Sequence, residues 1–514
     1  MEQIFLDLWV IVVVLPLYWC LHVLYNLFLH PLSRYPGPKL WAASRLPYAI
    51  SLARGNLVHD TWAIHEKYGK TVRLAPNELS FTNKEAWQDI YGSRSRGHAE
   101  FPKNPAWIRP APNGAWSILD APEEIHARQR KILNYAFSHA ALKSQEPYVQ
   151  KYASLLVQRA RELGQMDMKD WYAFTTFDIT GDLTFGQSFY CLENGKYHRW
   201  VAYLFAHLKA SCLLASISFY PLLLNILWVF LPKSSFNERL YHFQKSVKWV
   251  HKRLDTKNDR EDFISYITDN NVGKTMTTEE IEATSGTLVI AGSETSSTVL
   301  TSTTLNLLIN PEKLRKLAQE IRTSFTVEDE ITSQALNRLP YLNAVFQENF
   351  RYSPPVPCSI PRVVPKGGDV IAGNHFPEGI FVGLPQIPVY RSSHYFALPH
   401  AFLPERWLDP KNSAFFPTGN DPDFDKNTFL HDDRVVVQTF SVGPRQCIAQ
   451  NLGLLEVKII LARLLWNFNL EFMGGKKELL RMREQPWDSQ KTYGLWVKRP
   501  LHVRLIPVET VVSM

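Results

Sequence analysis

The sequence contains few cysteines, and no two of them form a closely spaced pair. The five cysteines lie far apart along the 514 residues, at Cys20, Cys191, Cys212, Cys358 and Cys447. A disulfide framework needs dense cysteine in a short secreted chain, and a structural zinc site needs paired ligands such as C-x-x-C. The sequence indicates neither, and the body of the protein is predicted to face a reducing compartment.

The sequence also lacks features that divide a chain or attract a polyanion. No Gly/Ser linker, repeat or low-complexity tract interrupts it after residue 40, so one large domain is the simplest prediction. The net charge of +7 is spread thinly rather than clustered, which argues against nucleic acid as a partner. No Gly-rich flavin or nicotinamide segment is present, so electrons for any redox reaction must come from another protein.

The first 30 residues are almost entirely apolar. The run from Ile4 to Leu29 is long enough to cross about 30 Å of hydrocarbon at roughly 1.5 Å per residue. A cleaved signal peptide is the competing interpretation, but acidic residues precede the run and no small-x-small cleavage site follows it. We therefore expect a transmembrane helix at 1–30, a Pro-rich hinge at 31–40 and a body domain at 41–514. Arg34 and Lys39 follow the span, which places the body on the cytosolic side.

One segment near the C-terminus predicts a specific chemistry. Phe440-Ser441-Val442-Gly443-Pro444-Arg445-Gln446-Cys447-Ile448-Ala449 places a cysteine in a Gly/Pro/Arg loop that leads into an apolar helical pattern. Unpaired N–H groups at the start of that helix favour a thiolate. Gly443 allows the backbone to approach a flat macrocycle, Phe440 shields the sulfur from water, and Arg445 pairs with an anionic propionate. The loop is therefore predicted to hold an iron through Cys447.

An isolated cysteine is more often a buried, inert thiol, so this prediction depends on the neighbours of Cys447. In the pattern F-x-x-G-x-R-x-C-x-[GA], four positions besides the cysteine are restricted, and all of them match. The segment resembles the haem-thiolate loop of the cytochrome P-450 family. The resemblance covers essentially the whole chain and implies a mainly α fold with small β-sheets, in which residues 41–514 form the haem-thiolate catalytic domain.

The family resemblance extends to an E-x-x-R pair upstream. Glu348 and Arg351 lie three residues apart on a helix predicted between Pro340 and Pro354, so they share one face. Alone, they would be an ordinary surface ion pair. In the family the pair is buried and bonds the arginine of a later P-E-R motif, here Arg406, in a network that fixes the core around the haem loop.

A further motif lies within a long apolar helix predicted from Thr278 to about Leu308. Ala291-Gly292-Ser293-Glu294-Thr295 in its middle has poor helix propensity, which predicts a local opening of the helix. In the family this stretch crosses the distal face of the haem, and the residues matching Thr295 and Glu294 relay protons to bound dioxygen. Without the other motifs, hydroxyl groups that satisfy backbone carbonyls would be the better interpretation.

Cations for the haem propionates are expected at three further positions. His126 and Arg130 lie four residues apart on a helical pattern and can reach one ligand edge. They resemble the family's W/H-x-x-x-R pair. Arg362 falls where the family has another propionate-binding residue. Each alone would be a solvated cation, but with the other motifs they are predicted to bind haem b.

The substrate pocket is predicted to be mostly apolar and aromatic. By their positions in the family, the segments that form its walls are Phe101 to Leu119, Leu204 to Leu231, Ala283 to Thr295, Val356 to Ser359 and Trp487 to Tyr493. The apolar stretch Leu204 to Leu231 corresponds to the family's lid, although core helices are an equally good interpretation. We expect a hydrophobic polycyclic substrate of polyketide-like or terpene-like character.

The resemblance implies a monooxygenase that inserts one oxygen atom from O2 into a lipophilic small molecule by hydroxylation or epoxidation. Segments such as Leu495-Trp496-Val497-Lys498-Arg499-Pro500-Leu501 are similar to fungal microsomal members of secondary-metabolite pathways, which act on polyketides, terpenoids or alkaloids. The implied electron donor is an NADPH–cytochrome P-450 reductase, with cytochrome b5 as a further candidate. The implied location is the endoplasmic reticulum membrane.

The reductase is expected to dock on the face that carries the Cys447 loop. Positive charge there would attract an acidic partner, and the predicted sources of this charge are Arg128, Lys131, Lys458 and Arg463.

Two other classes of function compete with a monooxygenase. A haem-thiolate isomerase or dehydratase rearranges a peroxide without dioxygen or reductase, and such members tend to lose the acid–alcohol pair. This sequence retains that pair as Glu294 and Thr295. A non-catalytic membrane haem protein would not require a proton relay. The retained pair therefore favours the monooxygenase.

Overall fold

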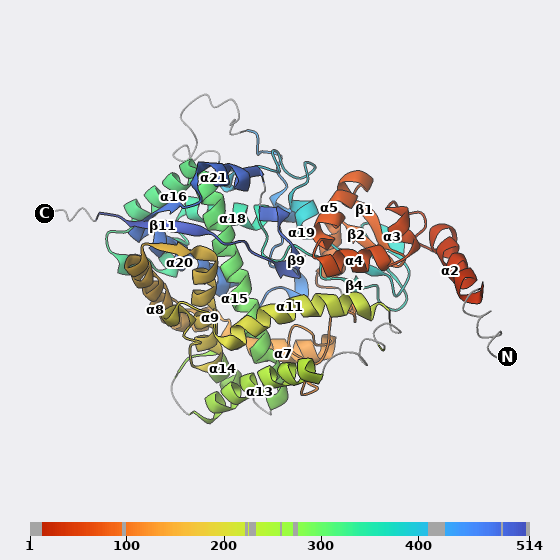
Figure 1. The fold of residues 1–514 in the computed structure, drawn as a ribbon, viewed down its shortest axis with the longest axis horizontal. Helices are drawn as coiled ribbons and strands as arrows, with labels where there is room; N and C mark the ends of the chain where they lie inside the picture. Colours follow the sequence, from red (N-terminus) through yellow and green to blue (C-terminus); the bar gives the residue numbers. More distant parts are fainter. Residues whose placement is uncertain are drawn as a thin grey trace.

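The computed structural model describes residues 13–509 apart from 95–98, 221–224, 226–232, 257–259, 271–275, 410–426 and 485–486. Helices dominate the described residues (Figure 1). They are α2 (Leu15–Leu24), η2 (Tyr25–Leu29), α3 (Lys39–Ala43), α4 (Leu46–Arg54), α5 (Leu57–Tyr68), α6 (Glu85–Tyr91), α7 (Glu123–Ala136), α8 (His139–Leu163), α9 (Met168–Phe185), α10 (Cys191–Asn194), α11 (Arg199–Ser218), α13 (Lys233–Asp255), α14 (Phe263–Asn270), α15 (Thr278–Ile309), α16 (Pro311–Ser324), η4 (Glu328–Glu330), α17 (Ser333–Leu336), α18 (Pro340–Tyr352), α19 (Gln386–Tyr390), η5 (Pro404–Trp407), η7 (Arg434–Val436), η8 (Gly443–Arg445), α20 (Gln450–Asn467), α21 (Gly475–Glu484) and η9 (Trp487–Ser489).

Four small sheets complete the described fold. The largest has the strand order β1-β2-β7-β4, and the others are β3-β11-β8, β5-β6 and β9-β10. The strands are β1 (Thr71–Ala75), β2 (Glu78–Phe81), β3 (Gln165–Asp167), β4 (Arg362–Val363), β5 (Asp369–Ile371), β6 (Asn374–Phe376), β7 (Phe381–Gly383), β8 (Phe468–Phe472), β9 (Thr492–Tyr493), β10 (Leu495–Trp496) and β11 (His502–Pro507). The prediction of a mainly α fold with small sheets is confirmed.

Helix α15 runs through the centre of the molecule and organises the core (Figure 1). Thr277 and Glu280 form a capping box at its start, and it packs against α9, α20 and α18. Gly292 allows the close approach of α9, because a Cβ there would lie 3.1 Å from the Thr180 methyl group. The helix is continuous through Ala291-Gly292-Ser293-Glu294-Thr295, so the expected local opening is not seen. Packing against α9 and α20 outweighs the poor propensity of this stretch.

The E-x-x-R residues lie in a fully buried charge network. Glu348, Arg351 and Arg406 each have 0% side-chain exposure, and Glu348 accepts from Arg351 Nη2 at 2.7 Å and from Arg406 Nε at 3.2 Å. Burial acts to raise the pKa of Glu348, but the two guanidinium groups outweigh it and the pKa is lowered. Sequence reasoning missed two members: Trp407 donates its indole N–H to Glu348 at 2.9 Å, and Asp432 pairs with Arg406.

Arg351 also ties this network to the chain that precedes the Cys447 loop. Its guanidinium donates to the carbonyl oxygens of Tyr390, Pro399 and Ala401 at 2.8 to 2.9 Å. The network therefore ties helix α18 to the short helix α19 and to the chain before η5, which has no regular secondary structure.

The N-terminal segment projects from the body (Figure 1). Its junction with the body is held by buried polar contacts: the Asn26 amide donates to the Ala43 carbonyl at 2.9 Å, and buried Arg73 donates to the Asn26 carbonyl at 2.8 Å. The first part of the predicted transmembrane helix, residues 1–12, lies outside the described residues. Over the residues that are described, no helix combines the length and apolarity needed to cross a bilayer.

Replacing Glu348 by Gln should destabilise the protein, because Arg351 would keep a buried charge without its carboxylate partner and Arg406 would keep only Asp432. Breaking one member of a buried ion pair costs about 3–5 kcal/mol. Chemical denaturation followed by circular dichroism measures this loss. Glu312→Gln is the matched control: Glu312 and Arg315 have the same i,i+3 spacing but are 79% and 75% exposed, so it should cost less than about 1 kcal/mol. Equal losses in both variants would contradict the proposed importance of the network.

Candidate active site

The Cys447 loop is a tight turn closed by its own backbone. The Cys447 N–H donates to the Phe440 carbonyl at 2.9 Å, across the short helix η8. Gly443 has φ +75°, and a Cβ there would overlap the Tyr91 carbonyl oxygen at the end of α6. Gly443 is therefore required for the close packing of α6 on the loop, a different reason from the approach of a macrocycle predicted from sequence.

Cys447 differs from Cys191 and Cys212 because its side chain lines a cavity. Cys191 and Cys212 are packed and buried, whereas Cys447 is accessible although it lies between α15, α18 and α20. Burial in this cavity raises the pKa of the Cys447 thiol, while the Ala449 backbone N–H and the charge of Arg130 act to lower it. The predicted backbone donor to the sulfur is thus present, and helix α20 itself begins three residues further on.

The cavity at Cys447 has mostly apolar walls. Its lining comes from α9, α15, α18, α20 and the loop, and includes Ile179, Leu288, Val299, Phe350, Phe440, Ile448 and Leu452. Phe440 packs edge-to-face on Phe350, with ring centroids 5.3 Å apart. The polar side chains that face the cavity are Thr180, Thr295, Ser296, Cys447 and Glu456.

Glu294 and Thr295 point to different surroundings although they are adjacent in α15. Thr295 lines the Cys447 cavity, and its hydroxyl donates to the Ala291 carbonyl at 2.6 Å. Glu294 is 3% exposed and does not line that cavity; it pairs with Lys498 at 2.8 Å. Lys498 also donates to Ser297 Oγ at 2.7 Å, and its burial lowers its pKa against the opposing influence of Glu294. Lys498 is a partner of the acid–alcohol pair that sequence reasoning missed.

A cluster of basic side chains lies beside the Cys447 loop and contains four predicted residues. These are His126, Arg130, Arg362 and Arg445. The structure adds Lys103, whose backbone forms an isolated antiparallel β-bridge with Arg362 at the start of β4. Arg130 donates to the Gln446 carbonyl at 2.6 Å. The carboxylate of Glu100 accepts from Arg362 Nη1 at 3.0 Å and from Arg445 Nε at 2.8 Å.

Burial, reinforced by the neighbouring cations, lowers the pKa values of His126 and Lys103 in this cluster. Burial lowers the pKa of His126 to about 3, with Arg445 and Lys103 as the next causes. Burial also lowers the pKa of Lys103 to about 7, reinforced by Arg362 and Arg445. The Arg362 Nε is buried without a hydrogen-bond partner among the described residues. So many cations around one carboxylate provide a favourable site for further anionic groups.

These residues fit a haem b group. Cys447 provides a sulfur for the iron, the apolar walls suit a macrocycle, and the basic cluster of Lys103, His126, Arg130, Arg362 and Arg445 suits two propionates. The unpartnered Nε of Arg362 is a donor that a propionate oxygen would satisfy.

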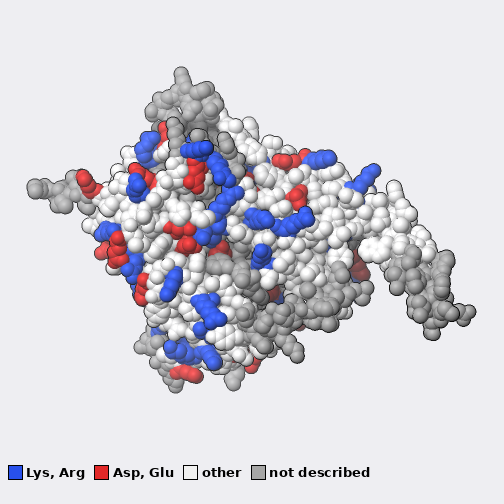
Figure 2. All heavy atoms as spheres, in the orientation of Figure 1, with Lys and Arg blue, Asp and Glu red and all other residues white. Residues whose placement is uncertain are grey.

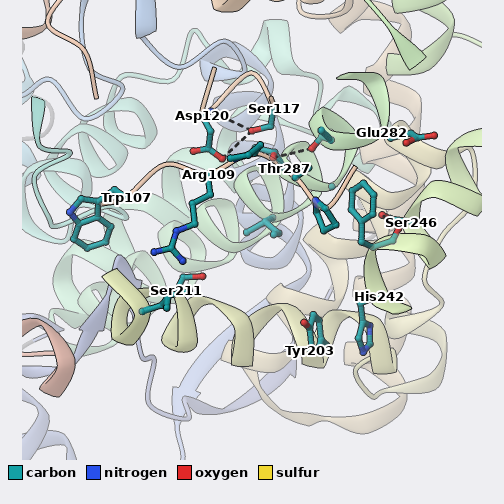
Figure 3. Close-up of a pocket in the computed structure, with 18 of the residues that line it drawn as sticks. Trp107, Arg109, Ser117, Asp120, Tyr203, Ser211, His242, Ser246, Glu282 and Thr287 are labelled. Atoms are coloured by element: carbon teal, nitrogen blue, oxygen red, sulfur yellow. Dashed lines mark hydrogen bonds between the residues drawn. The ribbon is translucent and has the colours of Figure 1, made fainter. Parts of the chain in front are cut away.

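A second cavity of about 280 Å³ lies further along α15 (Figure 3). Its walls are the chain from Ala106 to Asp120, α11, α13 and α15. Figure 3 shows Trp107 and Arg109 on one side and Tyr203 and His242 on the other, where the last two rings stack with centroids 3.7 Å apart. The volume approaches the range of roughly 300–1,000 Å³ that is typical of small-molecule pockets.

The two cavities share one face of α15. Ala283, Gly286, Thr287 and Ile290 line the second cavity, and the next residues, Ala291 and Thr295, line the cavity at Cys447. Ala283, Thr287, Ala291 and Thr295 follow one another at steps of four residues, so the two cavities lie one after the other along this face of the helix. The Glu282 carboxylate forms a hydrogen bond with His251 Nε2 of α13 at 2.7 Å and accepts one from the Asn113 side-chain amide at 2.9 Å. These two bonds connect three walls of the pocket.

Three of the five predicted pocket walls line this aromatic cavity, and two do not. The chain within Phe101 to Leu119, the described start of Leu204 to Leu231, and Ala283 to Ile290 contribute. Cys358, Ser359 and Thr492 line a separate cavity against α4, α5 and β2, with Trp107 between the two. Sequence reasoning missed α13, which supplies His242, Phe243 and Ser246. Residues 221–224 and 226–231, in the last part of the predicted lid, lie outside the described residues.

The predicted positive docking residues are mostly not available to a partner. Lys458 is buried and donates to Asn337 at 2.8 Å, and Arg463 is buried beside Ser154 and Glu328. Arg128 pairs with Glu280 at 2.6 Å, while Lys131 is exposed. The prediction was wrong for Lys458 and Arg463, because both lie on the inner faces of α20. Figure 2 shows both signs of charge intermixed over the visible face of the body.

Comparisons with known proteins agree with this site. The sequence profile of the family described as cytochrome P-450 matches residues 36–492. The chain is 41% identical to cytochrome P-450 monooxygenase astJ of Aspergillus oryzae, over 96% of this chain and 97% of that protein. It is 41% identical to averantin hydroxylase of Dothistroma septosporum, over 94% of this chain and 88% of that protein. It is 38% identical to monooxygenase efuB of Hormonema carpetanum, over 95% and 94% respectively.

The chain belongs to the cytochrome P-450 family and is an oxidoreductase of the monooxygenase type. Its cofactor is haem b, and electrons reach it from NADPH through a reductase.

Replacing Cys447 by Ala should abolish haem incorporation, because no other thiol lines the cavity in the part of the chain that the structure describes. The carbon monoxide difference spectrum of the reduced protein and the haem-to-protein ratio measure this. Cys20→Ala is the control and should leave both unchanged, since Cys20 is exposed on α2. A thiolate-type spectrum retained by Cys447→Ala would show that another residue is the ligand.

Replacing Lys103 by Met should weaken haem retention roughly tenfold to a hundredfold, since a charge-assisted hydrogen bond is worth about 1.5–3 kcal/mol. The rate of haem transfer to an acceptor protein measures the effect. Lys84→Met is the control, because Lys84 is exposed and pairs with Asp433 away from the loop. Identical transfer rates in wild type and Lys103→Met would remove Lys103 from the propionate site.

Proposed function

We propose that the protein inserts one oxygen atom from O2 into a lipophilic small molecule, by hydroxylation or epoxidation. The observation that carries this proposal is the shared face of α15, whose residues line an aromatic pocket and, further along the helix, the cavity of the Cys447 thiol. Haem b, when bound, supplies the activation of dioxygen. The chain supplies the pocket that holds the substrate, the thiol and the groups that handle protons.

Each predicted site residue has a proposed role. Cys447 would hold the iron through its sulfur, with Phe440 and Gly443 shaping its loop. The propionates are bound by Arg445, His126, Arg130 and Arg362, to which we add Lys103. The Glu348, Arg351 and Arg406 network keeps the chain before the loop in place.

Thr295 and Glu294 are proposed to handle protons beside the cavity of the Cys447 thiol. The Thr295 hydroxyl lies in the cavity and donates to a carbonyl of its own helix, so it can turn to donate a proton into the cavity. Glu294 is paired with Lys498, and this contact orients this part of α15. The retained acid and alcohol favour a monooxygenase over a haem-thiolate isomerase or dehydratase and over a non-catalytic membrane haem protein.

The substrate class is proposed from the pocket and from the relatives. Aromatic and aliphatic side chains dominate the pocket, including Trp107, Trp200, Tyr203, Phe243 and Ile290. One relative is named for the hydroxylation of averantin, and the relatives reported above come from fungi. We propose a step in fungal secondary-metabolite biosynthesis, acting on a polyketide, terpenoid or alkaloid type of substrate.

We further propose three functional regions: a membrane anchor at 1–30, a hinge at 31–40 and the catalytic domain at 41–514. Exposed apolar side chains on the projecting segment support contact with lipid, among them Leu17, Leu21, Phe28 and Leu29. In this proposal the anchor crosses the endoplasmic reticulum membrane once and leaves the catalytic domain in the cytosol. NADPH–cytochrome P-450 reductase, with cytochrome b5 as a second donor, would approach the face of the loop near Lys131.

Fungal microsomes that contain the protein and a reductase test the reaction. Supplied with NADPH, labelled dioxygen and extracts of candidate lipophilic metabolites, they should form a product that carries one labelled oxygen atom. A product formed without NADPH and without label would instead establish an isomerase or dehydratase. A haem-loaded protein that consumes no NADPH beyond the reductase alone would contradict both enzymatic proposals.

Replacing Thr295 by Ala should leave haem bound but divert electrons from product to hydrogen peroxide. The ratio of product to NADPH consumed should fall roughly tenfold or more, because positioned proton donors contribute about 10²- to 10⁴-fold. Thr295→Ser, which keeps a hydroxyl, is the matched control and should retain most of the coupling. Unchanged coupling in Thr295→Ala would exclude a role for this hydroxyl in proton handling.

A further inference from the structure

The aromatic cavity along α15 contains a permanent positive charge. Among the described residues that line it, Arg109 is the only lysine or arginine. A guanidinium group stays protonated at every physiological pH, and its planar N–H donors match the two oxygens of a carboxylate. Most of the other walls are aromatic or aliphatic, and charges attract one another more strongly in such surroundings than in water. Arg109 is therefore the residue of this cavity best suited to bind an anionic group.

The structure fixes the direction of the Arg109 side chain. Its Nη2 donates to Ser218 Oγ at 3.2 Å, and Ser218 is the last residue of α11. The Ser218 hydroxyl in turn donates to the Leu214 carbonyl at 2.7 Å. Figure 3 shows the guanidinium group extending toward α11, on the same side of the cavity as Trp107. The positive charge is thus held at one side of the cavity, where it contacts a neutral hydroxyl group.

Two carboxyl groups also line the cavity, but each has partners of its own. Glu282 bridges the loop and α13 through the two hydrogen bonds described above. Asp120 accepts from Ser117 Oγ at 3.3 Å. Burial raises the pKa of Asp120, while the charge of Lys103 and the Ser117 hydrogen bond act to lower it. Figure 3 shows both acids at the top of the view, whereas the Arg109 guanidinium extends downward, away from them.

The cavity of the Cys447 thiol offers an anion no such partner. Among the described residues that line it there is no lysine or arginine, and one of them is the acid Glu456. Its walls are mostly apolar, and an ionised carboxylate without a cation is strongly unfavourable in apolar surroundings. A molecule with one anionic end and one apolar end therefore has a single favourable orientation along this face of α15.

We propose that the protein selects lipophilic substrates that carry a carboxylate, and that Arg109 binds this group. The charged end is held beside α11, so the apolar end points along α15 toward the Cys447 cavity. The position that receives oxygen then lies remote from the carboxylate. Arg109 is a specificity-determining residue and takes no part in the transfer of protons or electrons. This inference rests on the proposed monooxygenase function and narrows its substrate class.

Equilibrium binding to the haem-loaded, full-length protein tests the charge preference without turnover. The probes are pyrenebutanoic acid and pyrenebutanamide, which have the same flat ring system and nearly the same shape but differ in charge at neutral pH. Quenching of the pyrene fluorescence by haem measures both dissociation constants. Wild type should bind the acid about tenfold to a hundredfold more tightly, as one charge-assisted contact predicts. Equal affinities, or no binding of either probe, would overturn the proposal.

Variants of the cavity assign the preference to a residue. Arg109→Gln should bring the ratio of the two dissociation constants close to one, mainly by weakening the binding of the acid. Arg109→Lys keeps the charge and should retain part of the preference. Ser246→Ala is the matched control, because Ser246 lines the same cavity from α13 without a charge, and it should leave the ratio unchanged. A wild-type ratio in Arg109→Gln would overturn the role of Arg109.

Nuclear magnetic resonance of the probes bound to wild type tests the orientation, and it decides the proposal even if Arg109→Gln fails to fold. Ferric iron accelerates the relaxation of protons, and this effect falls steeply with distance. The ring protons of the acid should therefore relax faster than the methylene protons beside its carboxylate. The amide, which has no charge for Arg109 to hold, should show a smaller difference. Equal relaxation along the acid, or faster relaxation beside its carboxylate, would contradict the proposed orientation.

Failure of this inference and failure of the proposed function give different results. Labelled oxygen that enters only neutral metabolites, together with equal binding of acid and amide, would overturn the carboxylate site and leave the monooxygenase. Preferred binding of the acid by wild type, with no labelled oxygen in any product, would overturn the monooxygenase and leave the carboxylate site.

Discussion

The whole arrangement depends on holding one sulfur atom at the wall of an apolar cavity inside the helical core. A thiol in such a place is normally packed and inert, and burial does raise the pKa of Cys447. The sulfur stays accessible because Cys447 lies in a loop. A backbone hydrogen bond between Phe440 and Cys447 closes this loop, and the end of α6 packs against Gly443. Rigidity of this loop matters because an iron ligand must be placed to within a fraction of an ångström.

Buried charge provides much of that rigidity. The Glu348 network holds the chain before the loop through bonds to backbone carbonyls, where regular secondary structure is sparse. The basic cluster beside the loop has the opposite effect on stability. Its cations repel one another around Glu100, and anionic groups bound there would offset this repulsion. One charged assembly stabilises the fold, and the other prepares it for a cofactor.

Helix α15 presents one face to both cavities. Its small and hydroxyl-bearing residues leave space for the aromatic pocket at one end and the thiol cavity at the other. Helix α20 crosses it and contributes Glu456 from the same segment that begins after Cys447. The ligand loop, the acid on α20 and the hydroxyls on α15 are therefore fixed relative to one another by a single helix crossing.

The sequence by itself determined the family, the fold class, the positions of α15 and α18, and the residues of the Cys447 loop. These follow from local spacing and helix signals, which act over a few residues. Only the tertiary structure decided which partners meet across long separations: Lys498 with Glu294, Asp432 with Arg406, and Lys103 with Arg362. It also showed that Lys458 and Arg463 point inward and that α13 lines the pocket. Such contacts depend on how helices rotate and pack, and an apolar helical pattern such as that of α20 does not reveal which of its charged residues become buried.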